Sequence, residues 1–284
     1  MFFGHAIRHW FRHIVGQKVR EKVAEAAREK MSEASPDEQQ PRPCDLGIVF
    51  ALAIESGCLE DLLADKISTR GDTLIVREGV LEDRNVALII SGPGRERAAR
   101  ATEALIDGHR PDWVLSAGFA GGLAAGLKRR DVLMADHVID TAGNQLSIDL
   151  KVDPDSLVRL PGVHVGRLLT AESVICRADE KRSLGQQHEA LAVDMETFAV
   201  AEVCRRRGVR FLAVRVINDT VDDELPHDIE PLLAQETTLA RIGAAVGSIW
   251  HRPASFKDIY GLRENALLAS DRLAKFIAGM IEQL

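Results

Sequence analysis

The chain has 284 residues, 46% of them hydrophobic, which is enough for one large domain with a full apolar core. Its formal net charge of −7 and its pI near 5.8 argue against a protein that binds nucleic acid through a broad basic surface. No run of 18 or more apolar residues occurs, so the sequence predicts no membrane-spanning helix.

Residues 1–31 have the pattern of one amphipathic helix, because apolar residues recur at helical spacing and basic residues fill the other faces. Such a helix could lie on an anionic membrane surface. The alternative is an arm that packs on its own domain or on a dimer partner. We favour the arm, since Glu21, Glu25 and Glu29 dilute the basic face. Residues 32–44 are polar and contain prolines, which is typical of a linker.

The remaining residues, 45–284, are predicted to form the main domain. Its expected elements, in chain order, are a strand at 46–52, a helix at 57–66, a strand pair at 72–80 and 84–91, a helix at 95–108, a strand at 112–118, a glycine-rich turn at 120–127, a strand at 131–140, a strand pair or a strand and loop at 166–175, helices at 179–188 and 195–207, a strand at 211–217, and closing helices at 230–250 and 262–283. This alternation predicts an α/β fold with three layers, α/β/α, around a central mixed twisted sheet.

Acidic residues stand close to the ends of these predicted strands. Glu55 follows the first strand, Asp194 and Glu196 open the helix at 195–207, and Asp219 ends the strand that starts at Phe211. Because ligands of α/β sheets collect at the carboxyl ends of the strands, we expect these carboxylates to converge on one crevice. A substrate made of a sugar and a base would use one carboxylate for its hydroxyls and another for a proton on the leaving base.

Arg215 lies inside the apolar strand FLAVRVIND, where an unpaired charge would be unfavourable. It is therefore predicted to orient a carboxylate or an anion. Glu55 is a candidate general base, although, taken alone, a glutamate that stabilises a helix N-terminus is the simpler interpretation. The glycine segments 91–95 and 116–127 would let backbone approach a ligand, but tight strand–helix turns use the same residues.

The cysteines and histidines indicate no metal site and no redox centre. Neither CxxC nor HExxH spacing occurs, and no metal or organic cofactor is indicated. Cys44, Cys58, Cys176 and Cys204 are expected to be reduced thiols of a cytoplasmic protein. The N-terminus also lacks the apolar block of a secretory signal. Peripheral membrane contact through residues 1–31 is the alternative for the location.

Taken together, these segments resemble the purine nucleoside phosphorylase/nucleosidase superfamily, and within it most of all the 5′-methylthioadenosine/S-adenosylhomocysteine nucleosidases. The resemblance covers roughly residues 45–250. Its most specific part, VDMETFAVAEVCRRRGVRFLAVRVINDTVDD, is similar to the family's V-E-M-E helix followed by a strand that ends R-x-x-S-D. The first strand with Glu55, the SGPG turn, the AGG turn and the LKRRDVL segment occur in the family's order.

The resemblance implies a role for each matching residue. Glu55 would activate the attacking water with help from Arg215, and Asp219 would donate a proton to N7 of the purine. Glu196 would hold the ribose hydroxyls, with Met195 packed under the sugar. The other residues implied to bind or surround the substrate are Asp194, Phe119, Ala120, Gly121, Val174, Ile175 and Asn218.

Four of these positions depart from the nucleosidase pattern. Phe119 stands where the nucleosidases carry a serine that helps to hold water, and Val174 stands where an aromatic ring stacks on the purine. Phe119 or Phe198 would then have to supply that ring. Asp194 replaces a glutamate. Asn218 replaces the serine before the catalytic aspartate, and either side chain can hydrogen-bond and orient that aspartate.

The nucleophile is predicted to be water. Phosphorylases of this superfamily bind phosphate with arginines near the first strand and the glycine-rich turn, and residues 53–57 and 115–122 contain none. Phosphorolysis, the adenosylhopane branch, futalosine hydrolysis and a non-catalytic nucleoside-binding protein are the alternatives. A homodimer is implied by the resemblance alone.

Overall fold

A ten-stranded mixed sheet forms the centre of the fold in the part of the chain that is described. The computed structural model describes residues 43–70, 74–150, 157, 159–225 and 255–282. The predicted N-terminal helix at 1–31, most of the predicted linker and the predicted helix at 230–250 lie outside them. The strands are β1 (Leu46–Phe50), β2 (Ala64–Arg70), β3 (Ile75–Leu81), β4 (Arg84–Ile90), β5 (Trp113–Gly122), β6 (Val132–Asp140), β7 (Gln145–Ser147), β8 (Val163–Thr170), β9 (Ala192–Asp194) and β10 (Arg210–Asp219).

The strand order is β10-β6-β8-β9-β5-β1-β4-β3-β2, and β10 also pairs with β5. Strands β10, β6, β8, β9 and β5 therefore close a ring, from which β1 to β4 extend as an open sheet. Whereas β9 pairs antiparallel with β5 and β6 pairs antiparallel with β10, strands β1, β5 and β10 run parallel to one another in the middle of this arrangement. Their carboxyl ends consequently lie at one edge, as the sequence predicted for the site.

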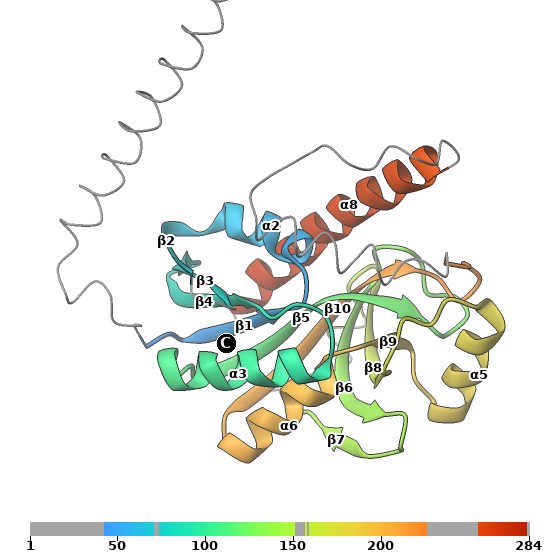
Figure 1. Ribbon diagram of the computed structural model, residues 1–284, viewed down its shortest axis with the longest axis horizontal. Helices are drawn as coiled ribbons and strands as arrows, with labels where there is room; N and C mark the ends of the chain where they lie inside the picture. Colours follow the sequence, from blue (N-terminus) through green and yellow to red (C-terminus); the bar gives the residue numbers. More distant parts are fainter. Residues whose placement is uncertain (1–42, 71–73, 151–156, 158, 226–254, 283–284) are drawn as a thin grey trace, which may run out of the picture. The chain divides into compact units, whose positions relative to one another are not determined.

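Helices cover both faces of the sheet (Figure 1). On one face lie α2 (Ala53–Leu62) and α8 (Ser255–Ile281), and on the other lie α3 (Arg95–His109) and α6 (Thr197–Arg207). Helix α5 (Ala178–His188) connects β8 to β9. The predicted three-layer α/β/α class is confirmed. No helix of the described residues is long and apolar enough to cross a membrane.

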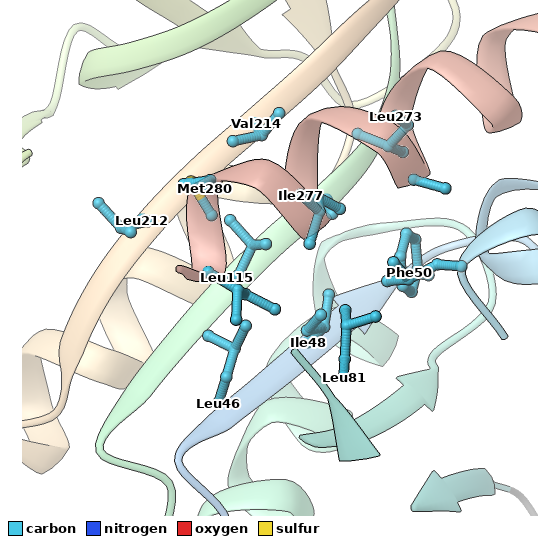
Figure 2. Close-up of a cluster of buried hydrophobic side chains, with 14 of the residues drawn as sticks. Leu46, Ile48, Phe50, Leu81, Leu115, Leu212, Val214, Leu273, Ile277 and Met280 are labelled. Atoms are coloured by element: carbon cyan, nitrogen blue, oxygen red, sulfur yellow. The ribbon is translucent and has the colours of Figure 1, made fainter. Parts of the chain in front are cut away.

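Successive strand residues are buried on opposite faces, which explains the continuous apolar runs in the sequence. Ile48 and Leu115 pack under α8 against Ile277 (Figure 2), whereas the neighbouring Val49 and Val114 pack under α3 and α6. These two cores hold the central strands rigidly, so the loops at their carboxyl ends start from fixed positions.

The structure differs from the predicted elements mainly between β1 and β3, and it contains two further short strands, β7 and β9, that were not predicted. Helix α2 begins at Ala53, directly after β1, and ends at Leu62 rather than at residue 66. After Leu63, the seven residues ADKISTR form the edge strand β2, which was not predicted from the sequence. Edge strands carry charged and polar residues that keep them from pairing with other chains, so they lack the apolar signal of a central strand.

Candidate active site

One cavity lies at the carboxyl ends of β1, β5, β9 and β10. Every residue predicted for the site except Arg215 lines it, and Arg215 lies behind this lining. The lining residues are Ala51, Leu52, Glu55, Pro93, Phe119, Ala120, Gly121, Ser173, Val174, Ile175, Val193, Asp194, Met195, Glu196, Asn218, Asp219 and Leu225. The structure thus brings together residues from positions 51 to 225.

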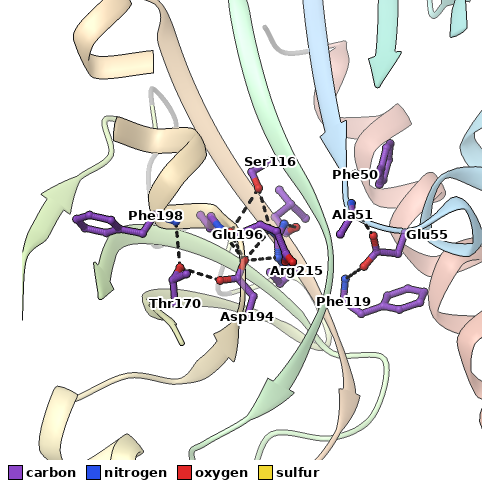
Figure 3. A network of polar contacts seen from close by, with 12 residues as sticks. Phe50, Ala51, Glu55, Ser116, Phe119, Thr170, Asp194, Glu196, Phe198 and Arg215 are labelled. Carbon is purple, nitrogen blue, oxygen red and sulfur yellow. Dashed lines mark hydrogen bonds and ion pairs between the residues drawn. The ribbon is translucent and has the colours of Figure 1, made fainter. Parts of the chain in front are cut away.

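Glu55 is held by backbone N–H groups in the first turn of α2. One carboxylate oxygen, Oε2, accepts hydrogen bonds from the N–H groups of Ala51 (3.0 Å) and Leu52 (2.8 Å), and Oε1 accepts one from Phe119 (2.9 Å; Figure 3). Burial raises the pKa of Glu55, while these N–H groups and the charge of Arg215 act in the lowering direction. The result is a buried carboxyl group that three backbone N–H groups hold in a fixed position.

The fixed position of Glu55 depends on a glycine in β5. A Cβ atom on Gly118 would lie 2.7 Å from Oε1 of Glu55 and 3.0 Å from its Cδ. These distances are too short for any side chain to fit without moving the carboxylate. Gly118 is therefore a supporting residue of the site, and the sequence showed it only as one of several glycines in a turn.

Arg215 forms a buried cluster with Asp194 and hydroxyl groups. Its Nη2 donates to Oδ2 of Asp194 (2.7 Å), to Oγ of Ser116 (2.8 Å) and to Oγ1 of Thr197 (2.6 Å; Figure 3). The side chain of Arg215 is 3% exposed, so a partner of opposite charge is required. Its hydrogen bonds go to this cluster and to the carbonyl oxygen of Val214 rather than to Glu55, on which Arg215 acts through its charge alone.

Both oxygens of Asp194 are used within the protein. Oδ1 accepts a hydrogen bond from Oγ1 of Thr170 (2.8 Å), and Oδ2 accepts from Arg215 and from the N–H (3.1 Å) and hydroxyl of Thr197. This arrangement favours a supporting role for Asp194, as the counter-ion of Arg215, over direct contact with a substrate.

Glu196 differs from Asp194 because only one of its two carboxylate oxygens accepts a hydrogen bond from a described protein group. The N–H of Gly94, in the SGPG turn, donates to its Oε1 (2.7 Å), and no described group donates to Oε2. Gly94 has φ = 101°, a conformation that favours glycine. Burial raises the pKa of Glu196, and the negative charge of Asp194 raises it further. The free oxygen on the cavity wall can bind hydroxyl groups.

Asp219 closes β10 after an irregularity in the sheet. Ile217 pairs with Ala120 and Asp219 pairs with Gly121, so Asn218 is an extra residue that bulges between them. Bulges of this kind often aim side chains into active sites. Oδ2 of Asp219 accepts a hydrogen bond from Nζ of Lys181 (2.5 Å). Burial raises the pKa of Asp219, whereas the ammonium group lowers it.

Asn218 lines the cavity but does not orient Asp219 in the way the resemblance implied. Its Oδ1 atom is buried and has no hydrogen-bond partner among the described residues. The ammonium of Lys181 instead holds the carboxylate of Asp219.

Of the two rings considered for the purine, only Phe119 lines the cavity. Phe198 is 2% exposed and packs in the core beneath α6, with the guanidinium carbon of Arg95 5.5 Å from its ring centre. The side chain of Arg95 also pairs with Glu172 (2.8 Å). The cavity lining includes no arginine or lysine among the described residues. These residues also contain no group of three or more acidic, histidine or cysteine side chains that could hold a metal ion.

Sequence analysis missed Lys181, Thr170, Thr197 and Ser116, all buried around the site. Hydroxyl residues carry little signal, because a buried threonine and an exposed one look alike in a sequence. Lys181 had a weak signal, since it lies three residues after Ala178 on the buried face of an otherwise polar helix.

Comparison of the chain with known proteins identifies a matching family and similar relatives. Residues 48–247 match the family described as the phosphorylase superfamily. The 5′-methylthioadenosine/S-adenosylhomocysteine nucleosidase of Haemophilus influenzae (strain PittGG) is 31% identical over 222 residues, which cover 70% of this chain and 97% of that protein. The nucleosidase of the same description from Actinobacillus succinogenes is 32% identical over 210 residues, covering 66% and 91%.

Two solved structures show the same fold. The nucleosidase of Neisseria meningitidis in complex with methylthio-immucillin-A has a TM-score of 0.65 at 21% identity, covering 84% of this chain and 99% of that one. The futalosine hydrolase of Helicobacter pylori has a TM-score of 0.65 at 18% identity, covering 86% and 98%. At these identities the likeness concerns the fold alone.

Proposed function

This chain belongs to the phosphorylase superfamily, and on that premise we propose that it hydrolyses the N-ribosidic bond of a purine nucleoside. The proposed substrate is a 5′-substituted adenosine such as 5′-methylthioadenosine or S-adenosylhomocysteine, in keeping with the nucleosidases that are about 30% identical to the chain. The observation that carries the proposal is the pair Glu55 and Asp219, two buried carboxyl groups on the wall of one cavity that has no cationic lining residue among those described. We assign this activity to residues 45–284.

The chemistry separates charge along the bond that breaks. As the bond between C1′ and the purine nitrogen lengthens, its electron pair moves to the base and positive charge develops on the sugar. A proton from Asp219 on N7 turns the base into a neutral leaving group. Glu196 binds the ribose hydroxyls, and its charge when ionised stabilises the cationic sugar. General acid catalysis of this kind typically contributes about 10²–10⁴-fold to the rate.

Glu55 activates the nucleophile, which is a water molecule. It accepts a proton from this water while the water oxygen attacks C1′. The three N–H groups that fix Glu55 leave its carboxylate little freedom to turn, which holds the water in place. Phosphate carries about two negative charges near neutral pH and needs arginine or lysine partners. A lining with four acidic residues, Glu55, Asp194, Glu196 and Asp219, and no cation among the described residues favours water instead.

Purine release measured with and without phosphate tests this proposal. We expect the purified protein to release adenine from 5′-methylthioadenosine and S-adenosylhomocysteine at rates independent of phosphate. Adenosine, inosine and futalosine complete the panel, because the fold is shared with a futalosine hydrolase. Release that requires phosphate would establish a phosphorylase. No release from any nucleoside would favour a lipid-linked substrate such as adenosylhopane, or a binding protein.

We also propose a homodimer, on the resemblance to the nucleosidases, and sedimentation velocity tests it. For residues 1–31 the alternatives are a packing arm and a membrane-surface helix. Deleting residues 1–43 distinguishes them: loss of binding to anionic vesicles with activity kept supports the membrane helix, and loss of activity or dimerisation supports the arm.

A further inference from the structure

Lys181 is a fully buried lysine whose ammonium group contacts the proposed acid. Its side chain is 0% exposed, and Nζ donates to Oδ2 of Asp219 (2.5 Å) and to the carbonyl oxygens of Thr220 (3.1 Å) and Asp223 (2.8 Å). An ammonium group has three N–H donors. All three are satisfied here, so the geometry is that of the charged form.

The helix that carries Lys181 is packed too closely for the side chain to move. Ala178, Lys181 and His188 form the buried face of α5. On the same face, a Cβ on Gly185 would lie 2.8 Å from the carbonyl oxygen of Leu123, so the helix backbone lies directly on the loop after β5. Lys181 does not line the cavity, and it therefore reaches Asp219 from the protein side while a substrate would reach it from the cavity.

Other charges around Asp219 lie farther from its carboxylate or are already paired. Asp223 raises the pKa of Asp219 and Arg129 lowers it, but these two side chains form an ion pair with each other (3.0 Å). Oδ2 of Asp223 also accepts hydrogen bonds from the N–H and hydroxyl of Thr220. Glu55 and Glu196 line the same cavity. Lys181 is thus the cation in direct contact with Asp219.

We propose that Lys181 is a positioning residue for Asp219, which turns its second oxygen toward N7 of the purine and stabilises the carboxylate that remains after proton transfer. The inference rests on the proposed nucleosidase function. In the transfer, the O–H bond of Asp219 breaks and an N7–H bond forms, while the electron pair of the ribosidic bond enters the base. The negative charge left on Asp219 stays against the ammonium of Lys181, which keeps its three protons. No described group donates to Oδ1 of Asp219, which leaves that oxygen for the base.

The charge of Lys181 also affects the pH dependence of the reaction. Asp219 acts in its protonated form, so activity is lost as pH rises through its pKa. A neighbouring ammonium lowers the pKa of a carboxyl group by about 1–3 units. Removing the charge of Lys181 therefore moves the alkaline limb of the pH profile upward. The plateau rate falls at the same time, because the carboxylate that forms has lost its counter-charge.

The test is the pH profile of kcat/KM for 5′-methylthioadenosine, which reports ionisations of the free enzyme. Lys181→Met and Lys181→Gln remove the charge, Lys181→Arg keeps it, and Lys275→Met on the exposed face of α8 is the matched control. Circular dichroism checks that each variant is folded. Glutamine retains a hydrogen-bond donor, so Lys181→Gln provides a second uncharged variant if Lys181→Met does not fold.

We expect the alkaline limb of the uncharged variants to move upward by about 1–3 pH units, with the plateau lowered by about 10²-fold. Lys181→Arg should return the limb close to its wild-type position, and Lys275→Met should change neither. A folded, uncharged variant whose alkaline limb stays in place overturns the inference. Absence of purine release, or of an alkaline limb, in the wild-type protein would instead reject the proposed function on which it rests.

Discussion

Replacing Gly118 by alanine should displace the proposed base by a fraction of an ångström and lower the rate without unfolding the protein. The added Cβ would lie 2.7 Å from Oε1 of Glu55, where ordinary contacts are 3.4 Å or more, so the carboxylate has to retreat by several tenths of an ångström. Gly118 does not have a positive φ, so the backbone itself accepts alanine. The change therefore acts on the position of Glu55.

The size of the effect follows from the hydrogen bond that this movement stretches. The Phe119 N–H lies 2.9 Å from Oε1 of Glu55, and a shift of this size takes it beyond a good hydrogen-bond length. Misplacing a catalytic group by about 1 Å can lower the rate by about 10²-fold. We therefore expect kcat for Gly118→Ala to fall by between about 10-fold and 10²-fold, with KM changed little because Glu196 is untouched.

The assay compares steady-state purine release by Gly118→Ala and Gly57→Ala. Gly57 lies in α2, and a Cβ there would meet nothing within 4 Å, so the same substitution should leave the rate unchanged. It should also stabilise the helix by about 0.5–1 kcal/mol. Thermal unfolding confirms that both variants are folded. A folded Gly118→Ala protein with the wild-type kcat would refute the reasoning about Glu55.

Three further predictions address the neighbouring groups. Arg215→Met leaves Asp194 buried without a counter-ion, and urea denaturation should show a loss of about 3–5 kcal/mol in unfolding free energy; a loss below about 1 kcal/mol contradicts the buried pair. Glu55 acts as a base in its ionised form, and burial raises its pKa above 4.5. The pH profile of kcat/KM should therefore decline on its acidic side at a pH above 4.5. A decline that begins only at or below pH 4.5 speaks against this assignment. Glu196→Gln should raise KM for ribonucleosides by about 10-fold to 10²-fold through a weaker hydrogen bond to the hydroxyls, yet leave a 2′,3′-dideoxy analogue unaffected; equal effects on both would exclude contact with those hydroxyls.

The sequence predicted most of the fold because its central strands are buried on both faces. Such strands appear as largely apolar runs, as at Leu46–Phe50 and Phe211 to Val216. Strand β2 was missed because it lies at the edge and carries polar residues. Helix α2 was placed four residues too late, because no polar cap residue announces a start at Ala53.

Glu196 follows β9, a short strand that pairs antiparallel with β5 and was not predicted. The meeting of Glu55 and Asp219 was predictable, because each stands near the end of a strand, and β1, β5 and β10 run parallel to one another and end at one edge. The partners of the charged residues were not. A buried arginine requires a counter-ion, but the sequence of the chain does not show which of several carboxylates lies close enough to pair with it. The structure shows that Arg215 takes Asp194, and that Asp219 takes Lys181 from a helix whose sequence is otherwise that of a solvent-exposed segment.

In the proposed reaction, Asp219 protonates the leaving base while Glu55 activates water. The most direct test compares 5′-methylthioadenosine with a 5-methylthioriboside of 4-nitrophenol, whose leaving group needs no proton. Asp219→Asn should lower the rate on the nucleoside by at least about 10²-fold but leave the rate on the nitrophenyl substrate within a few-fold of wild type. Glu55→Gln should impair both substrates. If Asp219→Asn lowers the rates on both substrates equally, Asp219 is not the acid that protonates the base.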